Sequence, residues 1–259
     1  MFKLSGLTVE QTLEIVPEKT ILLGYVGSTS HGTYIPKNDP ECIDDIDLLG
    51  IAVGSDKVYY GLGGTREERE QKEVKLNEWD SVVYEIRKAF RLLLQQNPNI
   101  MALLWLQEKD YIYISPTGKM ILDNRNLFVS KQAYHSSIGY AYGQLHRMTH
   151  NACEGYMGAK RKQLVEKFGF DCKNAAHLIR LLRMGIEYLG DGTLRVFRED
   201  ACELKEIKSG GWELERVQKE AERLFVLAQE AFVRSTLPAF PDKEKAEQLL
   251  ITILKKELS

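Results

Sequence analysis

Two aspartates, Asp45 and Asp47, stand one residue apart directly before the apolar run 48–53 (Leu-Leu-Gly-Ile-Ala-Val). An apolar run of this length bounded by turn residues is typical of a buried strand. Side chains alternate between the faces of a strand, so both carboxylates are expected on one face. Such carboxylates repel each other unless a cation lies between them, and Mg²⁺ suits this role because it binds carboxylate and phosphate oxygens. Taken alone, the pair is a weak signal and favours an acidic turn of a β-hairpin.

A turn of small residues precedes this pair. Residues 27–32 read Gly-Ser-Thr-Ser-His-Gly and directly follow the apolar run 21–26. Gly27 and Gly32 let backbone N–H groups approach a triphosphate, and Ser28 offers a hydroxyl. A strand, a glycine turn and a second strand with alternate carboxylates together predict a nucleotide-and-metal site, in preference to a simple hairpin.

These two motifs resemble the signature of the DNA polymerase β-like nucleotidyltransferase superfamily. More specifically, they are similar to its bacterial and phage branch of predicted nucleotidyltransferases associated with RNA-repair operons. Members of that branch read approximately Gly-Ser-x-x-x-Gly-Thr and then Ser-Asp-x-Asp-Leu-x-Gly-Val, which corresponds to residues 27–33 and 44–51 here. The connection 37–43 is longer than in the family, which affects the expected loop shape and not the carboxylate spacing.

The resemblance implies an α+β fold, with a polymerase-β-like core built on a small twisted sheet and a mostly helical C-terminal region. We expect a catalytic domain over residues 1–125 and a helical domain over residues 126–259 that completes the nucleotide site. The implied activity is transfer of a nucleoside monophosphate from a nucleoside triphosphate to an unidentified acceptor, with an RNA end favoured, and release of pyrophosphate. The alternative is a catalytically silent nucleotide- or RNA-binding module on the same scaffold.

A third carboxylate is expected on the next strand. Residues 80–86 have the strand pattern and lead into a predicted helix over 87–96. Alignment with the family's acidic residue selects Glu85, with Asp80 as the alternative. The two differ by an odd step, so a regular strand places them on opposite faces and only one can belong to the site. Glu85 is also compatible with a plain helix N-terminal acid. The resemblance implies that Asp45, Asp47 and Glu85 hold two Mg²⁺ ions.

A clear helical pattern covers residues 173–189, with an apolar stripe on one face and His177 and Arg180 on the other. The segment resembles the family's Lys-x-Ala-x-His-Leu-Ile-Arg-Leu-Leu-x-x-Gly motif. Because arginine offers a planar fork of donors to phosphate, we expect His177 and Arg180 to contact the triphosphate. A solvated cationic face is the alternative. The polar, glycine-rich segment 56–78 is expected to form an excursion or hairpin at the rim, and the helices after Trp212 to serve packing or self-association.

Composition sets outer limits on function. The chain has 259 residues, of which 44% are hydrophobic and 28% charged, and a formal net charge of −2, which excludes a grossly basic protein but not a local basic groove. Four scattered cysteines lack metal-ligand spacing, no apolar run approaches a membrane span, and the N-terminus lacks a signal-peptide core. We therefore expect a cytoplasmic protein with reduced thiols and no membrane partner. The acceptor, the nucleotide and the oligomeric state are left open.

Overall fold

The computed structural model describes residues 4, 6–36, 44–150 and 159–259. It contains two compact units that do not follow the chain linearly. Unit 1 comprises residues 1–30, 45–129 and 241–259, and unit 2 comprises residues 31–44 and 130–240. The final helix thus groups with the N-terminal residues, which a single division near residue 125 does not anticipate.

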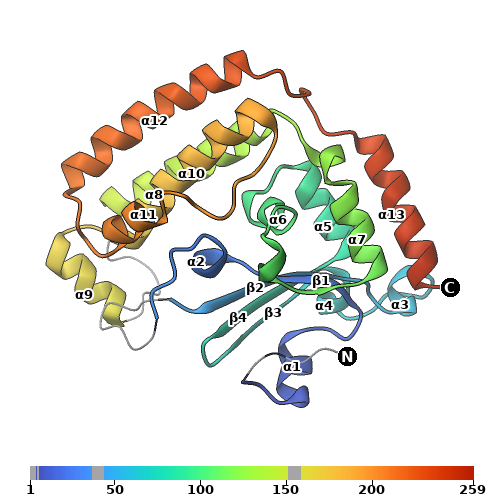
Figure 1. The fold of residues 1–259 in the computed structure, drawn as a ribbon. Coiled ribbons are helices and arrows are strands. Elements are labelled where there is room, and N and C mark those ends of the chain that lie inside the picture. The colour runs from blue at the N-terminus through green and yellow to red at the C-terminus, as the bar shows by residue number, and fades with distance from the viewer. Residues whose placement is uncertain (1–3, 5, 37–43, 151–158) are drawn as a thin grey trace. The chain divides into compact units, whose positions relative to one another are not determined.

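Unit 1 is built on a mixed five-stranded sheet in the described part of the chain, with the order β3-β4-β2-β1-β5 (Figure 1). Strands β2 and β4 run parallel, and the other neighbouring pairs run antiparallel. The strands predicted from apolar runs are confirmed. Segment 56–78, expected at the rim, also supplies an edge strand of the sheet. The strands are β1 (Thr20–Tyr25), β2 (Ile46–Ala52), β3 (Gln71–Leu76), β4 (Trp79–Glu85) and β5 (Tyr111–Ile114).

Helices cover both faces of this sheet (Figure 1). One face packs on α1 (Val9–Ile15), and the other lies under α5 (Ile86–Leu94), α6 (Pro98–Leu103) and α7 (Pro116–Asp123). The C-terminal helix α13 (Lys243–Glu257) packs on α5 and α7 and buries Ala246, Leu249 and Ile253. The short elements of unit 1 are α2 (Gly27–Ser30), α3 (Asp56–Tyr59), α4 (Arg66–Arg69), η1 (Glu108–Asp110) and η2 (Arg125–Phe128).

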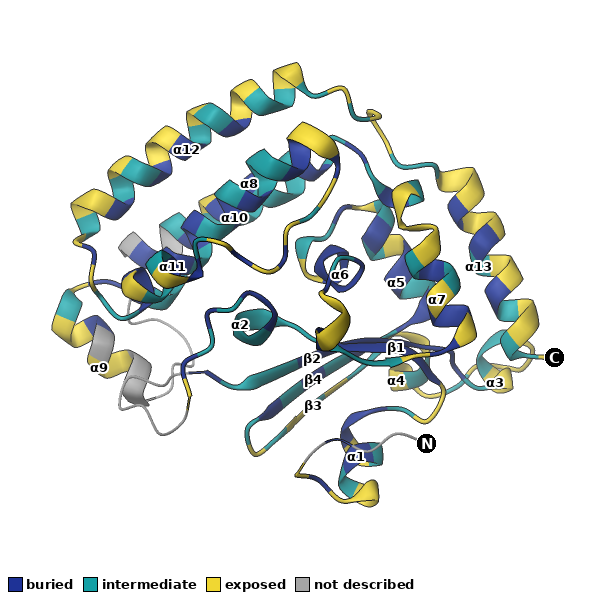
Figure 2. Cartoon of the chain, in the orientation of Figure 1, coloured by how far each residue is buried: buried dark blue, intermediate teal, exposed yellow. Residues whose placement is uncertain are grey.

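Unit 2 is helical. Its helices are α8 (Ala133–His150), α9 (Ala159–Phe168), α10 (Cys172–Asp191), α11 (Ala201–Lys208) and α12 (Leu214–Arg234). Helix α10 begins at the N-cap Asp171, whose carboxylate accepts a hydrogen bond from the backbone N–H of Asn174 at 3.2 Å. It packs against α8, α11 and α12, and its apolar stripe, including Leu178 and Leu182, is buried among them. Figure 2 shows this contrast between the buried α10 and the exposed outer face of α12.

The α+β class expected from the sequence is confirmed, with strands concentrated in unit 1 and helices in unit 2. The helix predicted over 173–189 is confirmed as α10. Among the described residues, no helix combines the length and the apolar character needed to cross a membrane.

Candidate functional site

Three neighbouring strands of unit 1 contribute one row of charged side chains. Asp47 of β2 is the direct partner of Asp80 in the parallel β2–β4 ladder. Asp80 is in turn the direct partner of Lys75 in the antiparallel β3–β4 ladder. Paired residues share a face of the sheet, and the alternate residues Leu48 and Trp79 belong to the core on the α1 side. The row Asp47, Asp80 and Lys75 therefore lies on the face opposite α1.

Gly27 lies directly against the carboxylate of Asp47. The backbone N–H of Val26 donates to the Asp47 carbonyl at 2.9 Å, which holds the turn beside β2. Gly27 has a φ of +63°, and a Cβ on it would lie 2.0 Å from Asp47 Oδ2. Position 27 thus requires glycine both for its left-handed backbone and for the close approach. The adjacent Ser28 lies in α2 and is partly buried.

Asp45 immediately precedes β2 and joins the same group of charges. Its Oδ2 accepts a hydrogen bond from Lys75 Nζ at 2.6 Å. The pKa of Asp80 is raised, chiefly because burial disfavours its charged form. The charge of Lys75 opposes this rise, and the charges of Asp45 and Glu73 add to it. The structure thus brings Asp45, Asp47 and Asp80 together on one face, with Lys75 beside them.

The structure does not bring Glu85 to this row. Glu85 pairs with Ala52 at the other end of the β2–β4 ladder, and its side chain is buried. Its carboxylate accepts hydrogen bonds from the backbone N–H groups of Arg87 and Lys88, at 3.0 and 3.2 Å, and from the Tyr59 hydroxyl at 2.7 Å. Glu85 is therefore the N-cap of α5.

This geometry separates the two candidate third carboxylates. Asp80 and Glu85 occupy opposite faces of β4, as the odd step between them requires, and Asp80 shares its face with Asp47. Glu85 already uses its oxygens to satisfy the first turn of α5. The residue in the row is Asp80, the alternative, and the helix-capping interpretation of Glu85 fits its contacts.

The second half of the small-residue turn belongs to unit 2. His31 is buried, and its Nδ1 donates to the Val196 carbonyl at 2.9 Å. Burial, followed by the nearby charge of Arg180, lowers the pKa of His31 well below its ordinary value, so the ring is neutral. Gly32 has a φ of +72°, and a Cβ there would lie 2.9 Å from the ring of Phe197. Gly32 thus permits close packing of this turn within unit 2.

Arg180 of α10 is a partly buried cation that has no hydrogen bond or ion pair with a carboxylate among the described residues. Its Nη1 donates to Met184 Sδ at 3.2 Å. Burial, and secondarily the charge of Arg198, lowers the pKa of Arg180 to about 10. His177 lies one helical turn earlier, and its charge also acts on His31. The structure thus groups His177 and Arg180 with His31. A partly buried guanidinium that donates to no carboxylate can bind an external anion, although the charge of Asp200 also acts on it.

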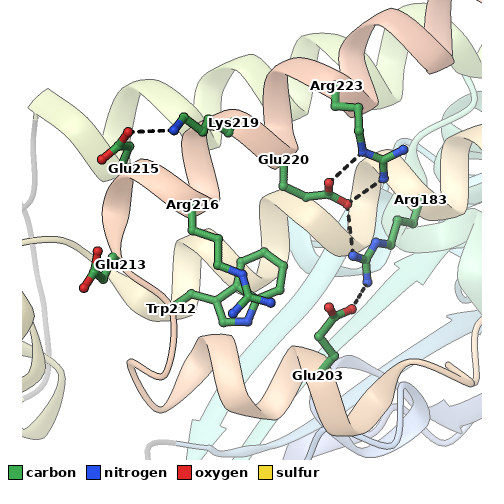
Figure 3. A pocket seen from close by; sticks show the side chains of 9 residues that line it. All are labelled: Arg183, Glu203, Trp212, Glu213, Glu215, Arg216, Lys219, Glu220 and Arg223. Carbon is green, nitrogen blue, oxygen red and sulfur yellow. Dashed lines mark hydrogen bonds and ion pairs between the residues drawn. The ribbon is translucent and has the colours of Figure 1, made fainter.

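Arg183, also on α10, is a partly buried arginine whose charge is neutralised within unit 2. Arg183 donates to Asp200 at 2.7 Å, to Glu203 at 2.5 Å and to Glu220 at 3.1 Å. This network borders a pocket of about 590 Å³ in which Arg223 also pairs with Glu220 (Figure 3). The pocket's ion pairs tie α10 to α11 and α12, so this part of unit 2 is a structural network and not the predicted phosphate contact.

The ion pair between Asp44 and Lys208 was not predicted from the sequence. Asp44, the residue before Asp45, is buried in unit 2, where Lys208 of α11 donates to its Oδ2. The backbone N–H of Ile35 donates to the same oxygen at 3.0 Å. Asp44 and Asp45 are adjacent in sequence but have different partners in different units. No local pattern could have paired Asp44 with a lysine 164 positions away.

The carboxylates of Asp45, Asp47 and Asp80, which together form the carboxylate row, suit a hard divalent cation. Asp45, Asp47 and Asp80 offer only oxygen donors, and the Asp47 carboxylate occupies the space that a side chain at position 27 would take. Within residues 4, 6–36, 44–150 and 159–259, no three His, Cys, Asp or Glu side chains are arranged to hold a metal ion by themselves. Mg²⁺ commonly uses one or two carboxylates and completes its shell with phosphate oxygens, so this donor set fits it.

A mixed sheet with paired aspartates beside a glycine turn defines a protein of the polymerase-β-like class. The sequence model of the RNA repair pathway DNA polymerase beta family matches residues 6–238. The chain therefore belongs to the RNA repair pathway DNA polymerase beta family. Neither the curated proteins nor the solved structures include a significant match to it.

Proposed function

We propose that the protein is a metal-dependent nucleotidyltransferase that transfers a nucleoside monophosphate from a nucleoside triphosphate to an RNA end. The observation that carries this proposal is the approach of Gly27 to the Asp47 carboxylate, with Asp80 in register beside it. Membership of a polymerase-β-like family supports nucleotidyl transfer, and the family's place in RNA repair supports an RNA acceptor.

The proposed step is an in-line displacement at the α-phosphorus. The acceptor hydroxyl oxygen forms the new bond to phosphorus, the bond to the bridging oxygen breaks, and pyrophosphate leaves. One or two of the carboxylates of Asp45, Asp47 and Asp80, together with phosphate oxygens of the nucleotide, would hold Mg²⁺, which would supply charge neutralisation for both the attacking and the leaving oxygens. We assign to Asp80 the acceptance of the hydroxyl proton, because burial raises the pKa of this carboxylate above its ordinary value.

The remaining residues position the nucleotide. Gly27 avoids a collision with the Asp47 carboxylate, and the backbone of its turn can approach phosphate oxygens. In unit 2, Arg180 offers a guanidinium that lacks a carboxylate partner in the described part of the chain, and we assign it to the triphosphate together with His177. Phosphoryl transfer depends mainly on such positioning and charge neutralisation.

The proposal is tested by incubating the protein with labelled nucleoside triphosphates, Mg²⁺ and RNAs with different ends. We expect pyrophosphate release and labelled RNA with the wild-type protein, and neither product with the Asp45→Ala/Asp47→Ala double variant. Tight nucleotide binding without turnover across all RNA, protein and small-molecule acceptors would instead identify a silent binding module.

Mg²⁺ and a nucleoside triphosphate should stabilise the protein together more than the sum of their separate effects. The triphosphate supplies oxygen ligands to Mg²⁺, and Mg²⁺ neutralises the charge of the triphosphate. Binding of both to the folded state raises the melting temperature by mass action. Because the pKa of Asp80 is raised in the folded state, its ionisation opposes folding as the pH rises, and metal relieves that cost. A thermal-shift grid should show synergy at neutral pH that shrinks on acidification. Strictly additive shifts would argue against a shared site.

Replacing Arg180 by alanine should weaken triphosphate binding by about 1.5–3 kcal/mol, the scale of a hydrogen bond to a charged group. Arg180→Lys should recover only part of this loss, because a point charge does not replace a planar fork. Titration calorimetry with a non-hydrolysable triphosphate measures both changes.

Leu182→Ala provides the matched control on the same helix. Leu182 is buried in the core of unit 2, so its truncation should lower the free energy of unfolding by about 2–5 kcal/mol and leave affinity per folded molecule nearly unchanged. Chemical denaturation of both variants separates the two effects. If Arg180→Ala bound the triphosphate as tightly as the wild type, the motif on α10 would be a cationic surface and not a triphosphate contact.

A further inference from the structure

A cation of the protein itself already lies among the proposed metal ligands. Lys75 Nζ is 2.6 Å from Asp45 Oδ2, and Lys75 is the direct strand partner of Asp80. The lysine thus contacts one carboxylate and stands beside another. All of these residues belong to unit 1.

The pairing of β3 with β4 determines the position of the Lys75 ammonium. The β3–β4 ladder pairs every residue from Gln71 to Leu76 with β4, so the position of Lys75 opposite Asp80 is set by the register of a whole strand. The side chain itself is 58% exposed, and that of Asp45 is 42% exposed. An ion pair this exposed is weak, because water screens it and the lysine stem is flexible. The ammonium can therefore leave the carboxylate without any change in the backbone.

We propose that Lys75 is an exchangeable internal counter-ion, which occupies the carboxylate row until a divalent cation together with a nucleoside triphosphate displaces it. This inference rests on the proposed function, since it assigns Asp45, Asp47 and Asp80 to a divalent cation. Lys75 neutralises part of the repulsion within the row while the site holds no metal.

The exchange makes the two ligands depend on each other. A divalent cation alone must compete with an ammonium that is tethered beside its ligands, so it binds weakly. A triphosphate adds oxygen ligands for the metal and offers the displaced ammonium a new anion. Lys75 thereby limits occupation of the row by metal in the absence of nucleotide.

The test measures Mn²⁺ affinity by titration calorimetry without nucleotide and with a non-hydrolysable triphosphate. Lys75→Met should bind Mn²⁺ alone about three- to tenfold more tightly than the wild type, because the competitor is gone. Its gain in affinity on adding nucleotide should be correspondingly smaller. Lys75→Arg retains a cation at the position and should bind Mn²⁺ alone within about twofold of the wild type.

Lys72→Met is the matched control. Lys72 lies three residues earlier on β3, an odd step that places it on the other face, and its Nζ donates to the Leu13 carbonyl at 3.1 Å and not to the row. The Lys72→Met variant removes the same charge from the same strand, so it measures the general electrostatic effect of losing one lysine on Mn²⁺ affinity. Circular dichroism and melting temperature establish that each variant folds.

Equal Mn²⁺ affinity in Lys75→Met and Lys72→Met would overturn the role of Lys75. If all variants still bound Mn²⁺ in a nucleotide-dependent manner, that result would nevertheless support the metal site. Absence of Mn²⁺ binding in every variant, even with saturating triphosphate, would overturn the metal site and this inference with it. Tighter binding in Lys75→Met alone supports both.

Discussion

Replacing Asp80 by asparagine should slow pyrophosphate release about 100- to 1,000-fold, which is the scale of losing one group that stabilises transition-state charge. Asparagine keeps the size of the side chain but removes the negative charge and the proton acceptor. Folding should be unaffected or slightly improved, because burial raises the pKa of Asp80 and its charged form therefore opposes folding. Single-turnover kinetics and chemical denaturation of the same preparation measure the two effects.

Glu85→Gln is the decisive comparison, since Glu85 was the residue that the sequence selected as the third carboxylate, with Asp80 as the alternative. Glutamine should lower the free energy of unfolding by about 1–2 kcal/mol, because it weakens the cap of α5 and the bond from Tyr59. The rate per folded molecule should stay within about threefold of the wild type, since Glu85 lies on the other face of β4. The reverse pattern, with a rate loss in Glu85→Gln and a normal rate in Asp80→Asn, would exclude Asp80 as the third carboxylate.

Gly27→Ala should reduce the rate of transfer about 100-fold or more while the protein still folds. The new methyl group would lie 2.0 Å from Asp47 Oδ2, so either the carboxylate or the turn must move. A displacement of about 1 Å in the positioning of reacting groups is enough for a loss of this size. Metal affinity in the presence of a triphosphate should fall in parallel, and both quantities are measurable on one preparation.

Gly6→Ala isolates the backbone contribution to that loss. Gly6 also belongs to unit 1 and has a φ of +83°, but a Cβ on it would meet nothing within 4 Å. Both alanine variants should therefore lose about 1–2 kcal/mol of stability from the left-handed backbone. Only Gly27→Ala should lose activity. Equal activity in the two variants would show that the turn can yield without disturbing Asp47.

Local patterns in the sequence predicted the part of the site that local geometry determines. Strand alternation before residue 48 and the glycine turn placed Asp47 and Gly27 close together, and the structure has them in contact. Alternation also showed that Asp80 and Glu85 cannot share a face. It could not decide which of them faces Asp47, because that depends on the register between β2 and β4, which pairs Asp47 with Asp80.

Residues that reach the site across the sheet were harder to recognise. Lys75 lies in a polar segment that resembles a surface excursion, because β3 is an edge strand with little apolar burial. The Asp44–Lys208 pair within unit 2 likewise joins distant positions. For Lys75 and for the Asp44–Lys208 pair alike, only the three-dimensional structure shows which residues are in contact.

The interleaved order of the two units bears on how the chain is synthesised. The polypeptide changes unit at the junctions 30/31, 44/45, 129/130 and 240/241. Helix α13 packs on α5 and α7, so those helices keep an apolar surface uncovered until residue 257 has emerged from the ribosome. A nascent chain that stops at residue 240 would contain Gly27, Asp47 and Asp80 and still lack the helix that covers α5 and α7. Truncation just beyond unit 2 is thus expected to yield an aggregation-prone fragment, although it removes none of the proposed catalytic residues.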